Sequence, residues 1–181
     1  MQVPDKDGVS AAAVMSELAS YLYHEGTTVA GKLEQLYVKY GVHVSNNSYL
    51  ICHSQPTIKQ IFNRIRNFNN ATYPTSIGPF KVSGVRDLTG EGYDSHYPDK
   101  RPVLPTGSSE MITLEFEEGC VATIRTSGTE PKIKYYSEIC RKPNDGMSKE
   151  DARKKIDELV HHLVETLLEP EKNNLQRKVE S

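Results

Sequence analysis

The chain has 181 residues, which is enough for one ordinary domain or for one domain and part of another. Hydrophobic residues make up 36% of it and charged residues 25%, a globular rather than a disordered composition. The net charge of -2 gives no electrostatic reason to expect a polyanionic partner, so nucleic-acid binding is not predicted.

The cysteines and the hydropathy of the sequence limit the cellular compartments in which we expect the chain. Cys52, Cys120 and Cys140 are far apart and form no CxxC motif, which argues against a zinc site and a secreted disulfide framework. No apolar run approaches the roughly 20 residues needed to cross a bilayer, and the N-terminal residues lack a basic and then apolar leader. We therefore expect a cytoplasmic chain without a membrane partner.

Two amphipathic segments at the start of the chain predict a pair of helices. Ser10 is placed to cap the first, and Gly26 ends it. The second runs from about Thr28 to Tyr40, with Gly41 where a C-terminal cap belongs.

The next segment, V-H-V-S-N-N-S-Y-L-I-C, alternates like a strand, and Q-P-T-I-K-Q-I-F-N-R-I-R after it predicts a helix with a proline in its first turn. On this helix Lys59, Arg64 and Arg66 predict an ordinary solvated basic face. Residues 67–109 are rich in turn formers and predict a loop with one strand, Phe80–Arg86.

The pattern is clearest from residue 110 onward. M-I-T-L-E-F, E-E-G and C-V-A-T-I-R predict a hairpin that turns at Gly119, and K-I-K-Y-Y-S-E-I-C predicts a further strand. S-K-E-D then starts a helix that keeps an apolar face until Pro170. The order of elements over residues 45–170 predicts an α+β domain, with helices on one face of a mostly antiparallel sheet and a loose tail at 171–181.

The stretch R-T-S-G-T-E-P-K-I-K, Arg125 to Lys134, joins two of these strands and carries the clearest chemistry. A phosphate needs charge and converging donors: an arginine fork, the Ser127 and Thr129 hydroxyls, and Gly128, where backbone N–H groups can approach without a Cβ in the way. A polar turn with solvated charges explains the same composition equally well. A P-loop is excluded, because no G-x-x-x-x-G-K followed by Ser or Thr occurs.

The longer stretch R-T-S-G-T-E-P-K-I-K-Y-Y is similar to the phosphate-binding loop in the last domain of the α-D-phosphohexomutases. D-K-D-G-V-S-A-A, V-R-D-L-T-G-E-G-Y-D and E-P-E-K-N-N-L-Q resemble the phosphoglucomutase 2 branch of that family. The resemblance implies a C-terminal portion of such a protein, with a helical remnant of the third domain at 1–44 and the fourth domain at 45–170.

The resemblance also implies roles for individual residues. The loop would hold the phosphate of a phosphosugar at the end that is not being transferred, through Arg125, Ser127, Gly128 and Thr129. Lys134 takes a second basic position where most family members carry arginine, which keeps the charge but gives up the bidentate fork. Lys6, in the K-D-G segment, would face the substrate as a candidate for proton transfer.

The family's phosphoserine, magnesium and sugar-selecting loops do not occur in the sequence. By resemblance, the parent protein interconverts 1-phosphate and 5- or 6-phosphate sugars through a bisphosphate, using Mg2+ held outside this chain and the missing N-terminal domains. We expect no metal ligands here and no turnover by the chain alone. Two alternatives stay open: a portion of a glucose 1,6-bisphosphate synthase, and a truncated, non-catalytic phosphosugar-binding module.

Overall fold

The computed structural model describes residues 7–143 and 145–178. These residues divide into two compact units, one that contains the two N-terminal helices and one that begins at His43. None of the helices in the described ranges is both long and apolar enough to span a bilayer.

The N-terminal unit consists of two capped helices, α1 (Gly8–His24) and α2 (Val29–Tyr40). Helix α1 begins earlier than the predicted cap at Ser10, because the Asp7 carboxylate accepts hydrogen bonds from the first backbone amides of the helix. Helix α2 has Thr28 as its N-cap, where the sequence predicts the segment to begin, and the predicted Gly41 as its C-cap. Large apolar side chains on both helices are exposed, among them Met15, Leu18, Leu33 and Leu36.

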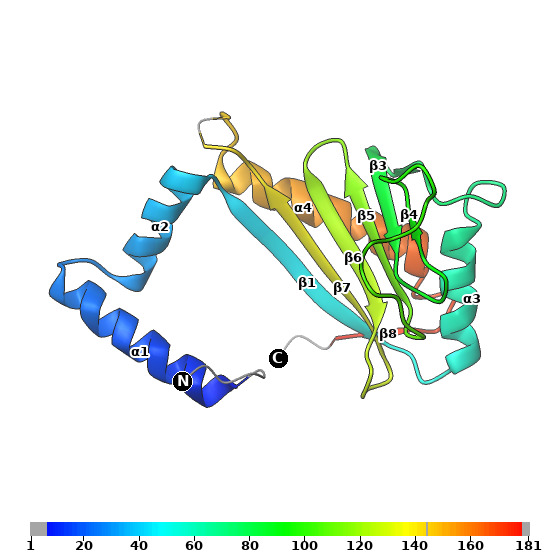
Figure 1. Ribbon diagram of the computed structural model, residues 1–181, viewed down its shortest axis with the longest axis horizontal. Helices are drawn as coiled ribbons and strands as arrows, with labels where there is room; N and C mark the ends of the chain where they lie inside the picture. Colours follow the sequence, from blue (N-terminus) through cyan, green and yellow to red (C-terminus); the bar gives the residue numbers. More distant parts are fainter. Residues whose placement is uncertain (1–6, 144, 179–181) are drawn as a thin grey trace. The chain divides into compact units, whose positions relative to one another are not determined.

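The second unit is built on an open, eight-stranded antiparallel sheet (Figure 1). Its strand order is β2-β3-β5-β6-β7-β1-β8, and β4 pairs with β3. The left-handed conformation of Gly119 allows the tight turn between β5 and β6 that the sequence predicts. The strands are β1 (His43–Ile51), β2 (Ser76–Ile77), β3 (Phe80–Asp87), β4 (Tyr93–Asp94), β5 (Met111–Phe116), β6 (Cys120–Thr126), β7 (Lys132–Cys140) and β8 (Gln176–Arg177).

Helices α3 (Gln55–Arg66) and α4 (Lys149–Leu163) cover one face of this sheet, and Figure 1 shows α4 crossing behind the long strands. Alternate strand residues are buried, as expected where only one face packs against helices. The α+β fold predicted from the sequence is confirmed. The side chains fully buried in its core include Phe62, Ile112, Leu114, Ile124, Ile133, Ile156 and Leu163.

The residues after α4 return to the sheet. A π-helical turn, η1 (Val164–Leu168), follows α4, and β8 then pairs with Leu50 and Ile51 of β1. Leu175 is buried just before that pairing. Residues 171–178 are therefore anchored, unlike the loose tail expected, because one apolar side chain and a short strand attach them to the sheet.

Residues 67–109 contain more order than the composition predicted. Buried Asp94, on β4, accepts hydrogen bonds from Arg86 at 2.8 Å and from the backbone amide of His96 at 3.1 Å, and its carboxylate lies 2.7 Å from the His96 ring. Burial by itself raises the pKa of Asp94, but the hydrogen bonds from Arg86 and His96 outweigh it and lower the pKa to about 2. This ionised carboxylate fixes the segment against β3.

Arg66 does not lie on the solvated basic face expected for α3. Its guanidinium donates to Asp87 at 2.6 Å and to Glu110 at 2.5 Å, and Tyr73 donates to Asp87 at 2.9 Å. Burial lowers the pKa of Arg66, but the two carboxylates outweigh it and raise the pKa overall. The cluster joins α3 to the end of β3 and to the residue before β5.

Candidate functional site

The predicted phosphate-binding residues lie in and beside the turn between β6 and β7. The Ser127 amide donates to the Lys132 carbonyl at 2.9 Å and closes the hairpin. The Thr126 amide donates to the carbonyl of Glu110 at 3.0 Å, and the Glu110 carboxylate accepts from Arg66. The loop is therefore held in place by the sheet and, through Glu110, by the ion cluster on α3.

Three consecutive backbone amides of this loop are available as donors. Within residues 7–143 and 145–178, the N–H groups of Gly128, Thr129 and Glu130 make no hydrogen bond, and neither do the Ser127 and Thr129 hydroxyls. All of these loop residues are at least partly exposed to solvent. Successive free amides at a turn are a common means of binding an anion.

Arg125 lies on the open face of the sheet, opposite the helices. Its guanidinium donates to the Tyr136 hydroxyl at 3.1 Å and to the Thr126 carbonyl at 3.2 Å. Its central carbon is 5.3 Å from the centre of the Tyr136 ring, a distance at which a cation is attracted to the ring face. Tyr136 therefore orients the arginine beside the loop.

Two lysines add positive charge next to Arg125. Lys134 is the cross-strand partner of Arg125, and Lys132 lies on the same face of β7. Both ammonium groups contact Glu130, at 2.6 Å from Lys132 and 3.3 Å from Lys134. The hydrogen bonds from Lys132 and then Lys134 lower the pKa of Glu130, so two ammonium groups share this carboxylate beside the loop.

A concavity of about 360 Å³ adjoins the loop. Its lining includes Arg125 and Gly128 of the hairpin, and Thr106, Gly107 and Ser109 of the segment before β5. The segment 105–109 was not predicted as part of the site. It reaches the loop because Gly107 exchanges backbone hydrogen bonds with Leu88 and Gly90 at the end of β3.

Most of the predicted site residues are brought together by the hairpin. Arg125, Ser127, Gly128, Thr129 and Lys134 all lie within it, whereas Lys6 is outside the described residues. The role of Tyr136 in orienting Arg125 was not predicted from the sequence. The signal available for it was the two-residue period of a strand, which places Tyr136 on the same face as Lys132 and Lys134.

These residues do not fit the magnesium ion that the family resemblance implies. Mg2+ prefers carboxylate and water oxygens in octahedral geometry, whereas the loop presents amides, hydroxyls and cations, and its carboxylate, Glu130, is paired with two lysines. No step of the chemistry is therefore assigned to a metal at this loop.

Comparison with known proteins identifies the class. No protein-family model matches the chain. Curated proteins do match it over nearly its whole length, and they are named as enzymes of sugar phosphates. The chain is a homologue of these enzymes and fits a portion of a phosphohexomutase-family protein.

Three relatives make the comparison specific. Human phosphopentomutase is 49% identical over 98% of this chain, and human glucose 1,6-bisphosphate synthase is 50% identical over 96% of it. A probable phosphoribomutase of Schizosaccharomyces pombe is 36% identical over 96%. The chain spans only 28 to 29% of the length of these relatives.

Proposed function

We propose that the β6–β7 loop binds the phosphate group of a sugar phosphate, at the end of the sugar that does not react. The observation that carries this proposal is the combination of three free consecutive amides with the oriented guanidinium of Arg125 and the ammonium of Lys134. Charge-assisted hydrogen bonds of this kind are about twice as strong as neutral ones. An exposed polar turn also leaves amides to solvent, but it does not require an arginine that a tyrosine orients beside them.

In the parent protein this binding would serve catalysis from a distance. A mutase of this class moves a phosphoryl group between two positions of one sugar, through a bisphosphate. Contacts to the unreactive phosphate fix the orientation of the sugar, so binding energy far from the reaction lowers its barrier. We place the phosphoserine and magnesium loops in parts of the parent protein beyond this chain.

The relatives support both a mutase and a bisphosphate synthase as the parent, at nearly equal identity. Both use sugar phosphates by name, so the role proposed for the loop is the same in each. The division into a third-domain remnant at 1–44 and a fourth domain at 45–170 belongs to the same proposal. So do the role of Lys6 in facing the substrate and a cytoplasmic location, which agrees with the three free cysteines.

The test is calorimetric titration of the 181-residue chain with glucose 1-phosphate and ribose 1-phosphate. We expect weak, saturable binding that Arg125→Ala reduces at least tenfold, because one charge-assisted hydrogen bond contributes about 1.5–3 kcal/mol. Arg101→Ala, which removes an exposed arginine elsewhere in the same unit, is the matched control and should bind like the unchanged chain. Equal binding by the Arg125 variant and the control would refute the site.

The same preparations test the proposal that the residues that transfer the phosphoryl group lie outside this chain. With Mg2+ and a sugar bisphosphate present, a coupled mutase assay should detect no turnover by the chain alone. Measurable turnover would show that the nucleophile lies within this sequence.

A further inference from the structure

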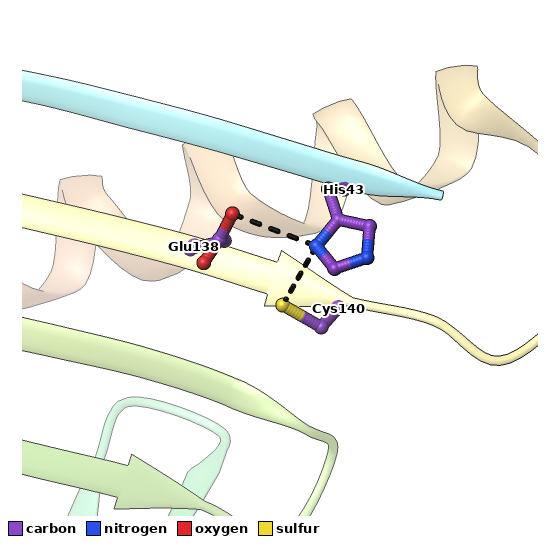
Figure 2. A group of neighbouring side chains, drawn as sticks. All are labelled: His43, Glu138 and Cys140. Carbon is purple, nitrogen blue, oxygen red and sulfur yellow. Dashed lines mark hydrogen bonds and ion pairs between the residues drawn. The ribbon is translucent and has the colours of Figure 1, made fainter. Parts of the chain in front are cut away.

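Three side chains with metal-ligand atoms meet at the other end of β7 from the phosphate loop (Figure 2). His43 is the first residue of β1, and Cys140, the last residue of β7, is its direct cross-strand partner. Glu138 lies two residues before Cys140, so its side chain leaves the strand on the same face. All three side chains are exposed, and a ligand could reach them from solvent.

The donor atoms converge on one point. The Nδ1 atom of His43 lies 3.2 Å from the Cys140 sulfur and 3.7 Å from the nearer carboxylate oxygen of Glu138. All three donor atoms lie within 4.8 Å of one another. In a tetrahedral zinc site with usual bond lengths, neighbouring ligand atoms are about 3.3–3.6 Å apart, so only small side-chain shifts are needed.

The same geometry argues against a nucleophilic cysteine. In a catalytic triad, one ring nitrogen of the histidine faces the nucleophile and the other faces the orienting acid. Here a single nitrogen, Nδ1, faces both the thiol and the carboxylate (Figure 2).

We propose that His43, Glu138 and Cys140 bind one zinc-type divalent cation, with a fourth position open to water. Imidazole nitrogen, thiolate sulfur and carboxylate oxygen are the three ligand types that Zn2+ uses in proteins. A thiolate disfavours hard cations such as Mg2+ and Ca2+. On binding, the thiol proton passes to solvent, the thiolate sulfur, the neutral imidazole and the Glu138 carboxylate each donate a lone pair, and no redox step occurs.

This site is separate from the loop proposed to bind phosphate. Cys140 lies eight residues along β7 from Lys132, a distance of about 26 Å at about 3.3 Å per residue. A cation there would not touch a phosphate held near Arg125. It would instead join the ends of two neighbouring strands and stabilise the folded chain.

The sequence does not predict this site, because the spacing of the three cysteines, taken alone, argues against zinc binding. The ligands come from strand pairing, which places His43 opposite a residue 97 positions later. The spacing E-x-C in β7 is a weak signal by itself. It becomes informative only once the register between β1 and β7 is known.

Cobalt titration of the reduced, tag-free chain tests the proposal, because Co2+ reports its own ligands. We expect one Co2+ per chain, visible bands of tetrahedral intensity and a thiolate-to-cobalt charge-transfer band in the near ultraviolet. Zn2+ should displace the cobalt, and excess Mg2+ should not. Cys140→Ser should abolish the charge-transfer band, and His43→Ala and Glu138→Gln should each weaken binding at least tenfold.

Matched variants separate this site from adventitious binding. His53→Ala and Glu117→Gln remove exposed residues of the same types in the same unit, and Cys120→Ala removes a buried thiol. These three should bind Co2+ like the unchanged chain. The proposal is overturned if the chain shows no charge-transfer band, if Cys140→Ser keeps it, or if the control variants weaken binding as much as the ligand variants.

Thermal unfolding completes the test. Without metal, the ligand variants should unfold at the same temperature as the unchanged chain, because their side chains are exposed. Zn2+ should raise the unfolding temperature of the unchanged chain but not that of Cys140→Ser. An equal rise in both would also contradict the proposal.

Discussion

The substitution Gly128→Ala distinguishes a phosphate-binding loop from a solvated polar turn more clearly than a substitution that removes a charged side chain. A Cβ built on Gly128 meets nothing within 4 Å, and the backbone there is not in the left-handed region. The folded chain therefore has no structural need for glycine at this position. Alanine should leave stability unchanged or raise it by about 0.4–1 kcal/mol, because it restricts the unfolded chain.

Phosphate binding should respond in the opposite direction. If the anion approaches the free amides of the loop, a methyl group on Gly128 obstructs it and at least one hydrogen bond is lost. A charge-assisted bond contributes about 1.5–3 kcal/mol, which corresponds to a loss of affinity of roughly 10- to 150-fold. Calorimetric titration with glucose 1-phosphate measures the affinity, and urea unfolding of the same samples measures the stability.

Gly119→Ala is the matched control, because Gly119 turns the neighbouring hairpin with a φ of +78°. Alanine there strains the backbone, so it should lower stability by about 1 kcal/mol or more and leave the affinity for the phosphosugar unchanged. The reasoning is refuted if Gly128→Ala binds the ligand as well as the unchanged chain, or if it destabilises the fold as Gly119→Ala does.

Three further predictions concern the framework that holds the site. Arg66→Met leaves buried Asp87 without its ion-pair partner and should lower the free energy of unfolding in urea by about 3 kcal/mol. Lys154→Met breaks an exposed ion pair and should lower it by less than about 1 kcal/mol. Equal costs would contradict the buried cluster. The folded-state pKa of Asp94 is about 2, below its unfolded value of 3.8, so its contacts stabilise the fold above about pH 4 and this stabilisation is lost as the pH falls towards 2. Melting temperatures measured across that range should fall for the unchanged chain and less steeply for Asp94→Asn; parallel curves would disprove the assignment. Ser148→Ala removes the cap of α4 and should cost about 1 kcal/mol by chemical denaturation, with no effect meaning that the cap is not formed in solution.

Local sequence signals were sufficient for the hairpins and for the start of α4, whereas the start of α1 is set by Asp7 and not by the predicted Ser10. Gly119 specifies the turn between β5 and β6, and Ser148 marks the start of α4, because each acts on residues within a few positions. The loop after β6 was placed between two strands for the same reason. The phosphate-binding chemistry proposed for it rests on the residue types, and the sugar-phosphate ligand proposed for it rests on the family resemblance.

Contacts between distant segments were not predictable from the same signals. Arg66 reads as a surface residue of an amphipathic helix, and only the fold brings it to Asp87, 21 residues away, and Glu110, 44 residues away. The concavity lined by residues 105–109 depends on their backbone bonds to the end of β3. Strand register, which local patterns leave open, decides which side chains become neighbours.

The central claim is that the β6–β7 loop binds the phosphate of a sugar phosphate, and amide chemical-shift mapping tests it most directly. The isotope-labelled chain would be titrated with ribose 1-phosphate and then with ribose as the matched ligand without phosphate. We predict saturable shifts at the amides of Gly128, Thr129 and Glu130 with the phosphate only. Saturable shifts that lie elsewhere in the chain, or that appear equally with ribose, would contradict the claim.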